Sequence, residues 1–116
     1  MWGLPTSVKI YLALHPCDMR KSFNGLYAEV RNSLGEDPLT GNLFLFTNKN
    51  RNRLKILYFD GSGLWCLAKR LERGKFSWPK QALDGSKKLR LDARAFSLLL
   101  EGVELKQCHK KAWYER

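Results

Sequence analysis

Residues 41–79 read GNLFLFTNKNRNRLKILYFDGSGLWCLAKRLERGKFSWP and decide much of the fold. Two runs rich in aromatic and branched side chains, Leu43–Thr47 and Leu54–Phe59, flank the basic, asparagine-rich segment Asn48–Arg53. Apolar runs on either side of a polar tip are typical of a β-hairpin. A second basic group follows the hairpin closely. We therefore expect a hairpin with a cationic end at the centre of the domain.

Apolar spacing and capping residues predict the other elements. Alternation of β-forming residues favours strands at Val8–Leu14, Lys75–Trp78 and Leu89–Leu91, with Val103–Leu105 as a possible addition. Three- and four-residue spacing favours helices at Met19–Leu34 and Ala93–Glu101, capped by Asp18 and Asp92 and ended by Gly35 and Gly102. The same spacing favours a helix from Leu64 to Arg73, although a strand through Leu64–Leu67 remains open.

These elements predict one α+β domain spanning residues 1–116. The chain has 116 residues and is 44% hydrophobic, which suits a single small core. The order β-α-β-β-α-β-β-α indicates a mainly antiparallel sheet with a basic β-hairpin and about three helices. Residues 106–116 form a basic tail that contains Trp113 and Tyr114.

The charge of the chain is strongly positive and unevenly distributed. Lys and Arg number 21 against 11 Asp and Glu, a formal net charge of +10. Between Lys49 and Lys75 there are eight cations and only two acids, Asp60 and Glu72. Cations at this density beside aromatic residues suit a polyanion, and nucleic acid is the commonest one. The plainer alternative is a basic protein whose charge serves solubility.

Two groups of cations are candidate nucleic-acid-binding residues. The hairpin group is Lys49, Arg51, Arg53 and Lys55, and the second group is Lys69, Arg70, Arg73 and Lys75. Such side chains can track phosphates, and Asn48, Asn50 and Asn52 could bond phosphates or base edges. Arg51, Arg53 and Lys55 occupy every second position, so an extended strand would project their side chains from one face. The alternative is a solvated turn and a solvated helix face whose charges oppose aggregation.

Aromatic side chains near these groups could stack on bases if they were exposed. The candidates are Trp65, Trp78, Phe44, Phe46, Tyr58 and Phe59. Aromatic residues at regular spacing more often form the core, so we expect most of them to be buried. Trp78 lies between Lys75 and Lys80. It is therefore the aromatic residue that we expect to be partly exposed and to join the binding site.

The sequence offers no convincing catalytic, metal or cofactor site. Asp60, Glu72 and Lys75 faintly resemble a nuclease triad, but their spacing departs from the usual acid-x-Lys signature. His15, Cys17, Cys108 and His109 lack the paired ligands of structural zinc. No phosphate-binding glycine loop or nucleophile–base pair is present. We therefore expect a protein without catalytic residues, metal or cofactor.

Cysteine usage and the amino-terminal residues indicate the compartment. Three widely spaced cysteines, Cys17, Cys66 and Cys108, do not form a disulfide framework. The longest apolar run near the start, Ile10–Leu14, is far shorter than the roughly 20 residues that a bilayer requires. We expect a reduced, cytoplasmic protein with no membrane partner.

Several motifs together resemble a known family. The segment Cys17-Asp18-Met19-Arg20-Lys21, followed by Gly25-Leu26, is similar to part of a family of small bacterial insertion-sequence proteins. So are Pro38-Leu39-Thr40-Gly41, the stretch NRNRLKILYFDGSGLWCLAKRLERGKFSWP, and the later SLLLEGVEL. The resemblance runs from about Val8 to Leu105. The family is the accessory protein of the second open reading frame, often labelled TnpB and distinct from the RNA-guided nuclease of that label.

The resemblance implies a role in transposition. Insertion elements of this kind also encode a larger DDE-type transposase, which carries the chemistry, and a second small accessory protein. The expectation is thus a non-catalytic factor that binds double-stranded DNA, at the element ends, through its basic residues. Two alternatives stay open. The positive face could dock the transposase or the other accessory protein without touching DNA, or the chain could be a small metal-dependent nuclease.

Overall fold

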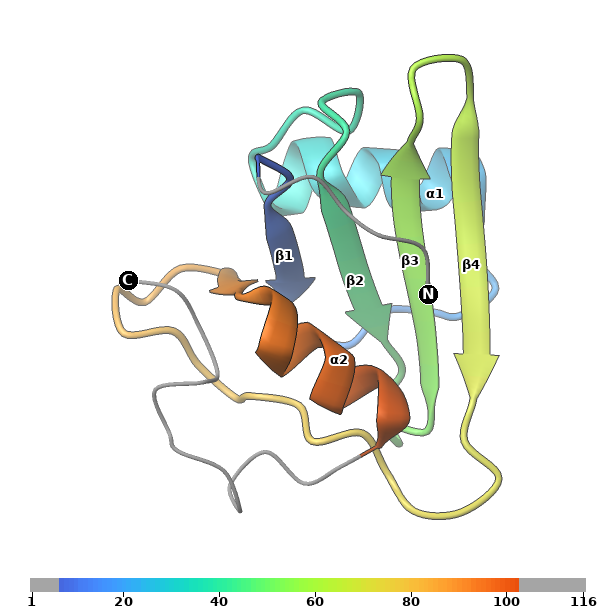
Figure 1. The fold of residues 1–116 in the computed structure, drawn as a ribbon, viewed down its shortest axis with the longest axis vertical. Coiled ribbons are helices and arrows are strands. Elements are labelled where there is room, and N and C mark those ends of the chain that lie inside the picture. Colours follow the sequence, from blue (N-terminus) through green and yellow to red (C-terminus); the bar gives the residue numbers. More distant parts are fainter. Residues whose placement is uncertain (1–6, 103–116) are drawn as a thin grey trace.

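The computed structural model describes residues 7–102 (Figure 1). Its strands are β1 (Ile10–Ala13), β2 (Leu43–Thr47), β3 (Arg53–Phe59), β4 (Leu64–Arg70) and β5 (Lys88–Leu91). Its helices are α1 (Phe23–Ala28), which continues as the π-helical turn η1 (Glu29–Ser33), and α2 (Ala93–Glu101). The predicted α+β class is confirmed. The possible strand at 103–105 and the basic tail lie outside the described residues.

The five strands form one mixed sheet in the order β4-β3-β2-β1-β5. The predicted hairpin is confirmed, because β2 and β3 pair antiparallel from Leu43 opposite Tyr58 to Thr47 opposite Leu54. The β3–β4 and β1–β5 pairs are antiparallel as well. However, β1 and β2 run parallel, which the expectation of a mainly antiparallel sheet did not include. The α1–η1 segment makes the crossover that a parallel neighbour requires.

Helices cover both faces of the sheet, so the domain has three layers (Figure 1). On the α1 side, Leu26, Val30 and Leu34 pack with Phe44, Phe46 and Leu57 of the sheet. On the α2 side, Ala95, Phe96 and Leu99 pack with a second row of strand residues and with Phe76 and Trp78 of the segment after β4. Because both faces of the sheet are covered, β2 carries apolar residues on both sides: its sequence LFLFT has four apolar residues followed by Thr47, and all five are buried.

The first helix begins later than predicted and is not capped by Asp18. Its N-cap residue is Ser22, whose side chain makes no capping hydrogen bond. The Asp18 carboxylate instead accepts hydrogen bonds from the backbone N–H and the guanidinium of Arg20. Asp18 therefore closes a turn upstream of the helix, and the predicted cap is wrong. The end is as expected, since Gly35 has a left-handed φ of 66°.

The predicted helix from Leu64 to Arg73 is wrong, because Leu64–Arg70 is strand β4. Leu64 and Cys66 pack on the α1 side, whereas Leu67 packs on the α2 side. Since both faces of the sheet are covered, a strand here carries apolar residues on both sides, and their spacing happens to imitate a helix. The described residues therefore contain two helical units, α1–η1 and α2, in place of about three.

The segment after β4 is irregular, and the predicted strand Lys75–Trp78 is absent from it. It crosses the α2 side of the sheet and buries Phe76 and Trp78 in the core. The predicted strand at Leu89–Leu91 is confirmed as part of β5. The last helix also matches its prediction: the side chain of Asp92 accepts from Ala95 N–H, and Gly102 ends the helix with φ of 78°.

Candidate nucleic-acid interface

The two basic groups of the sequence lie together at one end of the sheet. Arg53, the first residue of β3, is paired with Arg70, the last residue of β4. Beyond them, Leu71 N–H donates to Asn52 O at 2.9 Å, and Phe76 N–H donates to Arg51 O at 2.6 Å. The hairpin tip is thereby joined to the segment that follows β4. We call this region the basic end, comprising Lys49, Arg51, Arg53, Lys55, Lys69, Arg70, Arg73 and Lys75.

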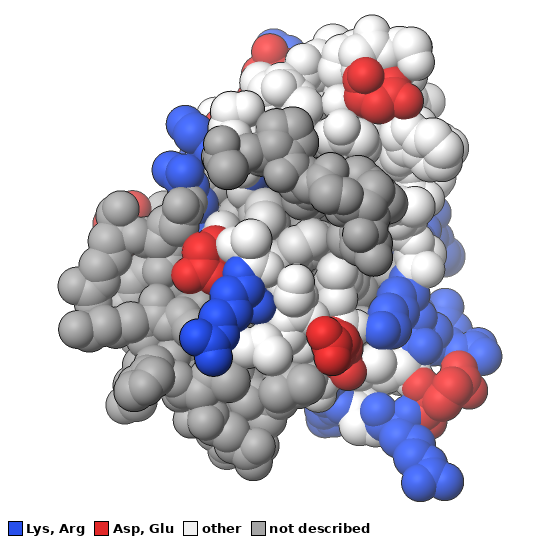
Figure 2. Space-filling view, viewed as in Figure 1, with Lys and Arg blue, Asp and Glu red and all other residues white. Residues whose placement is uncertain are grey.

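Figure 2 shows Lys and Arg side chains gathered at the lower right of the molecule, where β4 ends in Figure 1. Arg51 and Lys55 are half-buried there, and the other six cations are exposed: Lys49, Arg53, Lys69, Arg70, Arg73 and Lys75. Of the two acids counted in this stretch of sequence, only Glu72 lies at the basic end. Asp60 is in the turn at the opposite end of the β3–β4 pair. Asp60 therefore does not offset the cations of the basic end.

The asparagines of the tip shape the turn. Asn48 Oδ1 accepts from the N–H groups of Asn52 and Arg53, and Asn48 Nδ2 donates to Asn52 Oδ1 at 2.8 Å. The turn that these bonds close contains Arg51. Among the described residues other than glycine, Arg51 is the one with a left-handed backbone, at φ of 58°. The predicted shared face holds for Arg53 and Lys55 in strand β3, whereas Arg51 lies in the turn. Asn48 and Asn52 thus hold the shape of the tip through their own side chains.

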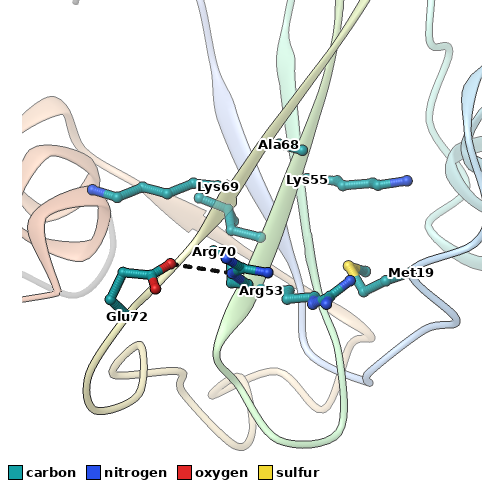
Figure 3. Close-up of a pocket in the computed structure, with 8 residues that line it drawn as sticks. Met19, Arg53, Lys55, Ala68, Lys69, Arg70 and Glu72 are labelled. Carbon is teal, nitrogen blue, oxygen red and sulfur yellow. Dashed lines mark hydrogen bonds and ion pairs between the residues drawn. The ribbon is translucent and has the colours of Figure 1, made fainter.

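Strand alternation divides the cations between the two sides of the sheet. Arg53 and Lys55 share the α1 side with buried Leu57, and Arg70 shares it with Cys66. Lys69 lies on the α2 side with Leu67. Figure 3 shows Lys55 and Lys69 pointing away from each other, towards the two helical layers.

Both of these lysines donate to backbone carbonyls. Lys55 Nζ donates to Lys21 O at 2.7 Å, just before α1. Lys69 Nζ donates to Leu100 O in the last turn of α2. A cation at this position complements the negative end of a helix dipole. Two of the eight cations, half-buried Lys55 and exposed Lys69, therefore already donate to carbonyls of the fold itself.

A hollow of about 330 Å³ opens beside the paired arginines (Figure 3). Its lining includes Arg53, Arg70 and Lys55, together with the less polar Met19 and Ala68. Glu72 lies at its rim and accepts from Arg70 Nε at 3.2 Å. This ion pair is largely exposed, so solvent weakens it. The hollow therefore keeps a clear excess of positive charge.

Asp60 is used by the turn that contains it. Its carboxylate accepts from the N–H groups of Ser62 and Gly63, from the hydroxyl of Ser62, and from Trp65 Nε1. The indole and these turn donors hold the pKa of Asp60 well below its usual value. Strand β4 separates Asp60 from Glu72 and Lys75, so the faint nuclease triad is not assembled. Within residues 7–102, no three His, Cys, Asp or Glu side chains gather as metal ligands.

The aromatic residues are arranged differently from the prediction at one position. Trp78 is only 4% exposed, and its Nε1 donates to Ala13 O at 2.8 Å. The expected exposure of Trp78 is therefore wrong, and a base could not stack on it in this position. Phe44 and Phe46 are buried as expected, while Tyr58 and Phe59 are half-buried. Trp65 is the exposed one, at 52%, near the Asp60 turn.

Cys17 and Cys66 are free and half-buried, whereas Cys108 is outside the described residues. Burial, followed by the nearby charge of Glu29, raises the pKa of the Cys17 thiol to about 11. A thiol of this kind stays protonated near neutral pH and acts as a packing residue.

None of the helices in residues 7–102 has the length and apolar character to cross a membrane.

Comparison with known proteins gives a family and two uncharacterized relatives. The family model described as IS66 Orf2 like protein matches residues 8–110, which confirms the resemblance found in the sequence. The chain is 38% identical to uncharacterized protein y4jC of Sinorhizobium fredii over 111 residues, which cover 96% of this chain and 92% of the relative. It is 36% identical over 98 residues to uncharacterized protein y4hO of the same organism, covering 84% and 83%. No solved structure matches the chain.

Proposed function

We propose a DNA-binding role in transposition for this chain, which belongs to the IS66 Orf2-like protein family. The family itself indicates an accessory role in an insertion sequence. The protein would be non-catalytic, would hold double-stranded DNA at the element ends, and would act beside the transposase and the second small accessory protein of the element. Its contribution would be binding energy and position, while the transposase carries out the strand chemistry.

The observation that supports this proposal is the basic end. Eight cations from two separate stretches of sequence lie at one end of the sheet, and of the two acids within residues 49–75 only Glu72 lies there with them. Charge gathered in this way repels itself unless an anion is bound, and the DNA backbone offers a regular row of phosphates. Phosphate contacts position a protein on a duplex without reading its sequence. Exposed Lys69 already donates to Leu100 O, so we expect the other exposed members to make most of these contacts: Lys49, Arg53, Arg70, Arg73 and Lys75.

Fluorescence anisotropy of the whole protein with element-end and random duplex, across a salt series, tests the proposal. Contacts to four or five phosphates predict a slope of log K against log salt of about −4 to −5 on both duplexes. Tighter binding to the element end would add base or shape readout. Absence of binding at low salt would contradict the DNA-binding role.

A pair of matched variants assigns the contacts to the basic end. Lys49→Gln with Lys75→Gln removes two exposed cations from it and should reduce the slope by about two. Lys9→Gln with Lys87→Gln removes two exposed cations beside β1 and β5, at the other side of the sheet. This control should leave the slope unchanged. An equal reduction in both double variants would show that net charge alone matters.

Docking to a protein without DNA contact is a second candidate, favoured by Trp65. This side chain is 52% exposed and is fixed by its hydrogen bond to Asp60, away from the basic end. Exposed, well-anchored tryptophans are typical of protein interfaces. If this function is the right one, Trp65→Ala should weaken co-purification with the transposase or the second accessory protein, and the free protein should not bind duplex at low salt.

A further inference from the structure

We propose that Arg53 and Arg70 together hold one phosphate of the DNA backbone in the hollow beside them. The inference rests on the proposed DNA-binding function and adds to it a specific phosphate site. The ligand is a phosphodiester group, whose shared chemistry with inorganic phosphate makes a test without DNA possible.

The pairing of the strands is the first reason. Arg53 of β3 lies directly opposite Arg70 of β4, on the α1 side of the sheet. Side chains directly opposite each other on neighbouring strands are close together, and like charges in this position destabilise the sheet. The backbone hydrogen bonds of the two strands keep both arginines there. An anion bound between them would replace this repulsion with two attractions.

The shortage of compensating acids is the second reason. Among residues 7–102, no carboxylate forms an ion pair with Arg53. Arg70 is bound to Glu72 through Nε alone, and both side chains of this pair are mostly exposed. The terminal amino groups of Arg70 remain able to donate elsewhere. A guanidinium presents its donors in a planar fork that matches two oxygens of one phosphate.

The walls of the hollow are the third reason. Lys55 and Lys69 also line it, but their ammonium groups reach outward to Lys21 O and Leu100 O (Figure 3). Their stems support the site while their charges are anchored to the two helical layers. Met19 and Ala68 offer no competing acceptor. The two arginines are thus the donors that the hollow leaves for an incoming phosphate.

A double-mutant cycle in the anisotropy assay tests the shared site. Arg53→Gln and Arg70→Gln should each weaken duplex binding by about tenfold, the loss of a charged hydrogen bond. Both arginines hold the same phosphate, so their effects on affinity should not be independent. The fold-loss of duplex affinity in the double variant should be clearly smaller than the product of the two single fold-losses. Losses that multiply would assign the arginines to separate phosphates and overturn the proposal. Lys55→Met should lower stability but leave the salt slope unchanged; a slope reduced as in Arg53→Gln would also contradict it.

Thermal unfolding in inorganic phosphate, compared with chloride at equal ionic strength, gives a readout that needs no DNA. Phosphate should raise the unfolding midpoint of the unmodified protein and should leave that of Arg53→Gln nearly unchanged. Equal shifts in the two proteins would overturn the site even if duplex binding is found. A selective phosphate effect without duplex binding would keep the site and refute the DNA-binding function.

Discussion

The two ends of the β3–β4 pair treat charge in opposite ways. At one end, the turn between the strands surrounds the Asp60 carboxylate with four hydrogen-bond donors, including Trp65 Nε1. At the other end, Arg53 lies opposite Arg70, and Arg70 makes a largely exposed ion pair with Glu72. The strands are seven residues long, so roughly 20 Å separate the two ends.

The two ends therefore show two kinds of charged side chain: one that is fully hydrogen-bonded within the fold, and others that have donors left for an external ligand. The Asp60 carboxylate is satisfied locally, and its depressed pKa reports that satisfaction. The basic end contains both kinds: Lys55 and Lys69 are bonded to carbonyls of the fold, whereas Arg53 forms no ion pair with a described acid. Charge density alone therefore does not identify a binding site; the bonds already made by each cation do.

The largest effect should come from the strand on which both ends depend. Leu57 lies within β3, is fully buried, and packs on the α1 side. Leu57→Ala should reduce the free energy of unfolding by about 2–5 kcal/mol, because a buried cavity replaces the side chain. Urea denaturation gives the value. Leu83→Ala, at an 84% exposed leucine, is the matched control and should change stability little. Similar losses at both positions would contradict the described core.

An intermediate effect is expected at the acidic turn. The folded pKa of Asp60 lies below its ordinary value of 3.8, so this residue adds stability above pH 3.8 that is lost as the pH falls below it. Asp60→Asn should lower stability near neutral pH and flatten its dependence on pH in acid. Urea denaturation from about pH 6 to pH 2 measures both.

Trp65→Phe refines this measurement, because it removes the Nε1 donor that contributes most to the pKa shift. The acid dependence of this variant should fall between those of the unmodified protein and Asp60→Asn. A profile for Asp60→Asn that runs parallel to the unmodified one would show that the turn does not use the charge of Asp60.

The smallest effect is expected at a lysine that the basic end uses internally. Lys69→Met keeps the side-chain stem but removes the cation from the last turn of α2, which should cost about 0.3–1 kcal/mol of stability. Its salt slope for duplex binding should stay the same. Lys75→Met should show the reverse, with stability kept and the slope reduced by about one. Identical behaviour of the two variants would remove the distinction between internal and free cations.

Several elements could be read from the sequence because local signals determine them. The hairpin 43–59, strand 89–91 and helix 93–101 were predicted from apolar runs, turn residues and the Asp92 cap, and the structure has all three. The family could also be recognised from motifs in one sequence. In the candidate site, the eight cations were identified by type and position, although their contact with DNA stays a prediction.

The misassigned elements share a physical cause. Leu64–Arg70 has helical spacing, but pairing with β3 and cover on both faces of the sheet make it a strand. Trp78 stands among lysines, yet its indole is buried against Ala13 O, 65 residues away in sequence. The β1–β2 pair is parallel because the α1–η1 segment carries the chain back across the sheet between the two strands, and such a crossover has no short turn signal in the sequence.

The sequence by itself determined the hairpin around its polar tip, the Asp92 cap of the last helix, the family and the excess of cations. Only the tertiary structure decided how those cations are used. Strand pairing placed Arg53 against Arg70, and the two helical layers engaged Lys55 and Lys69 through carbonyls distant in sequence. The reason is that local spacing fixes which residues share a face, whereas neighbours across strands and layers fix which charges are already satisfied.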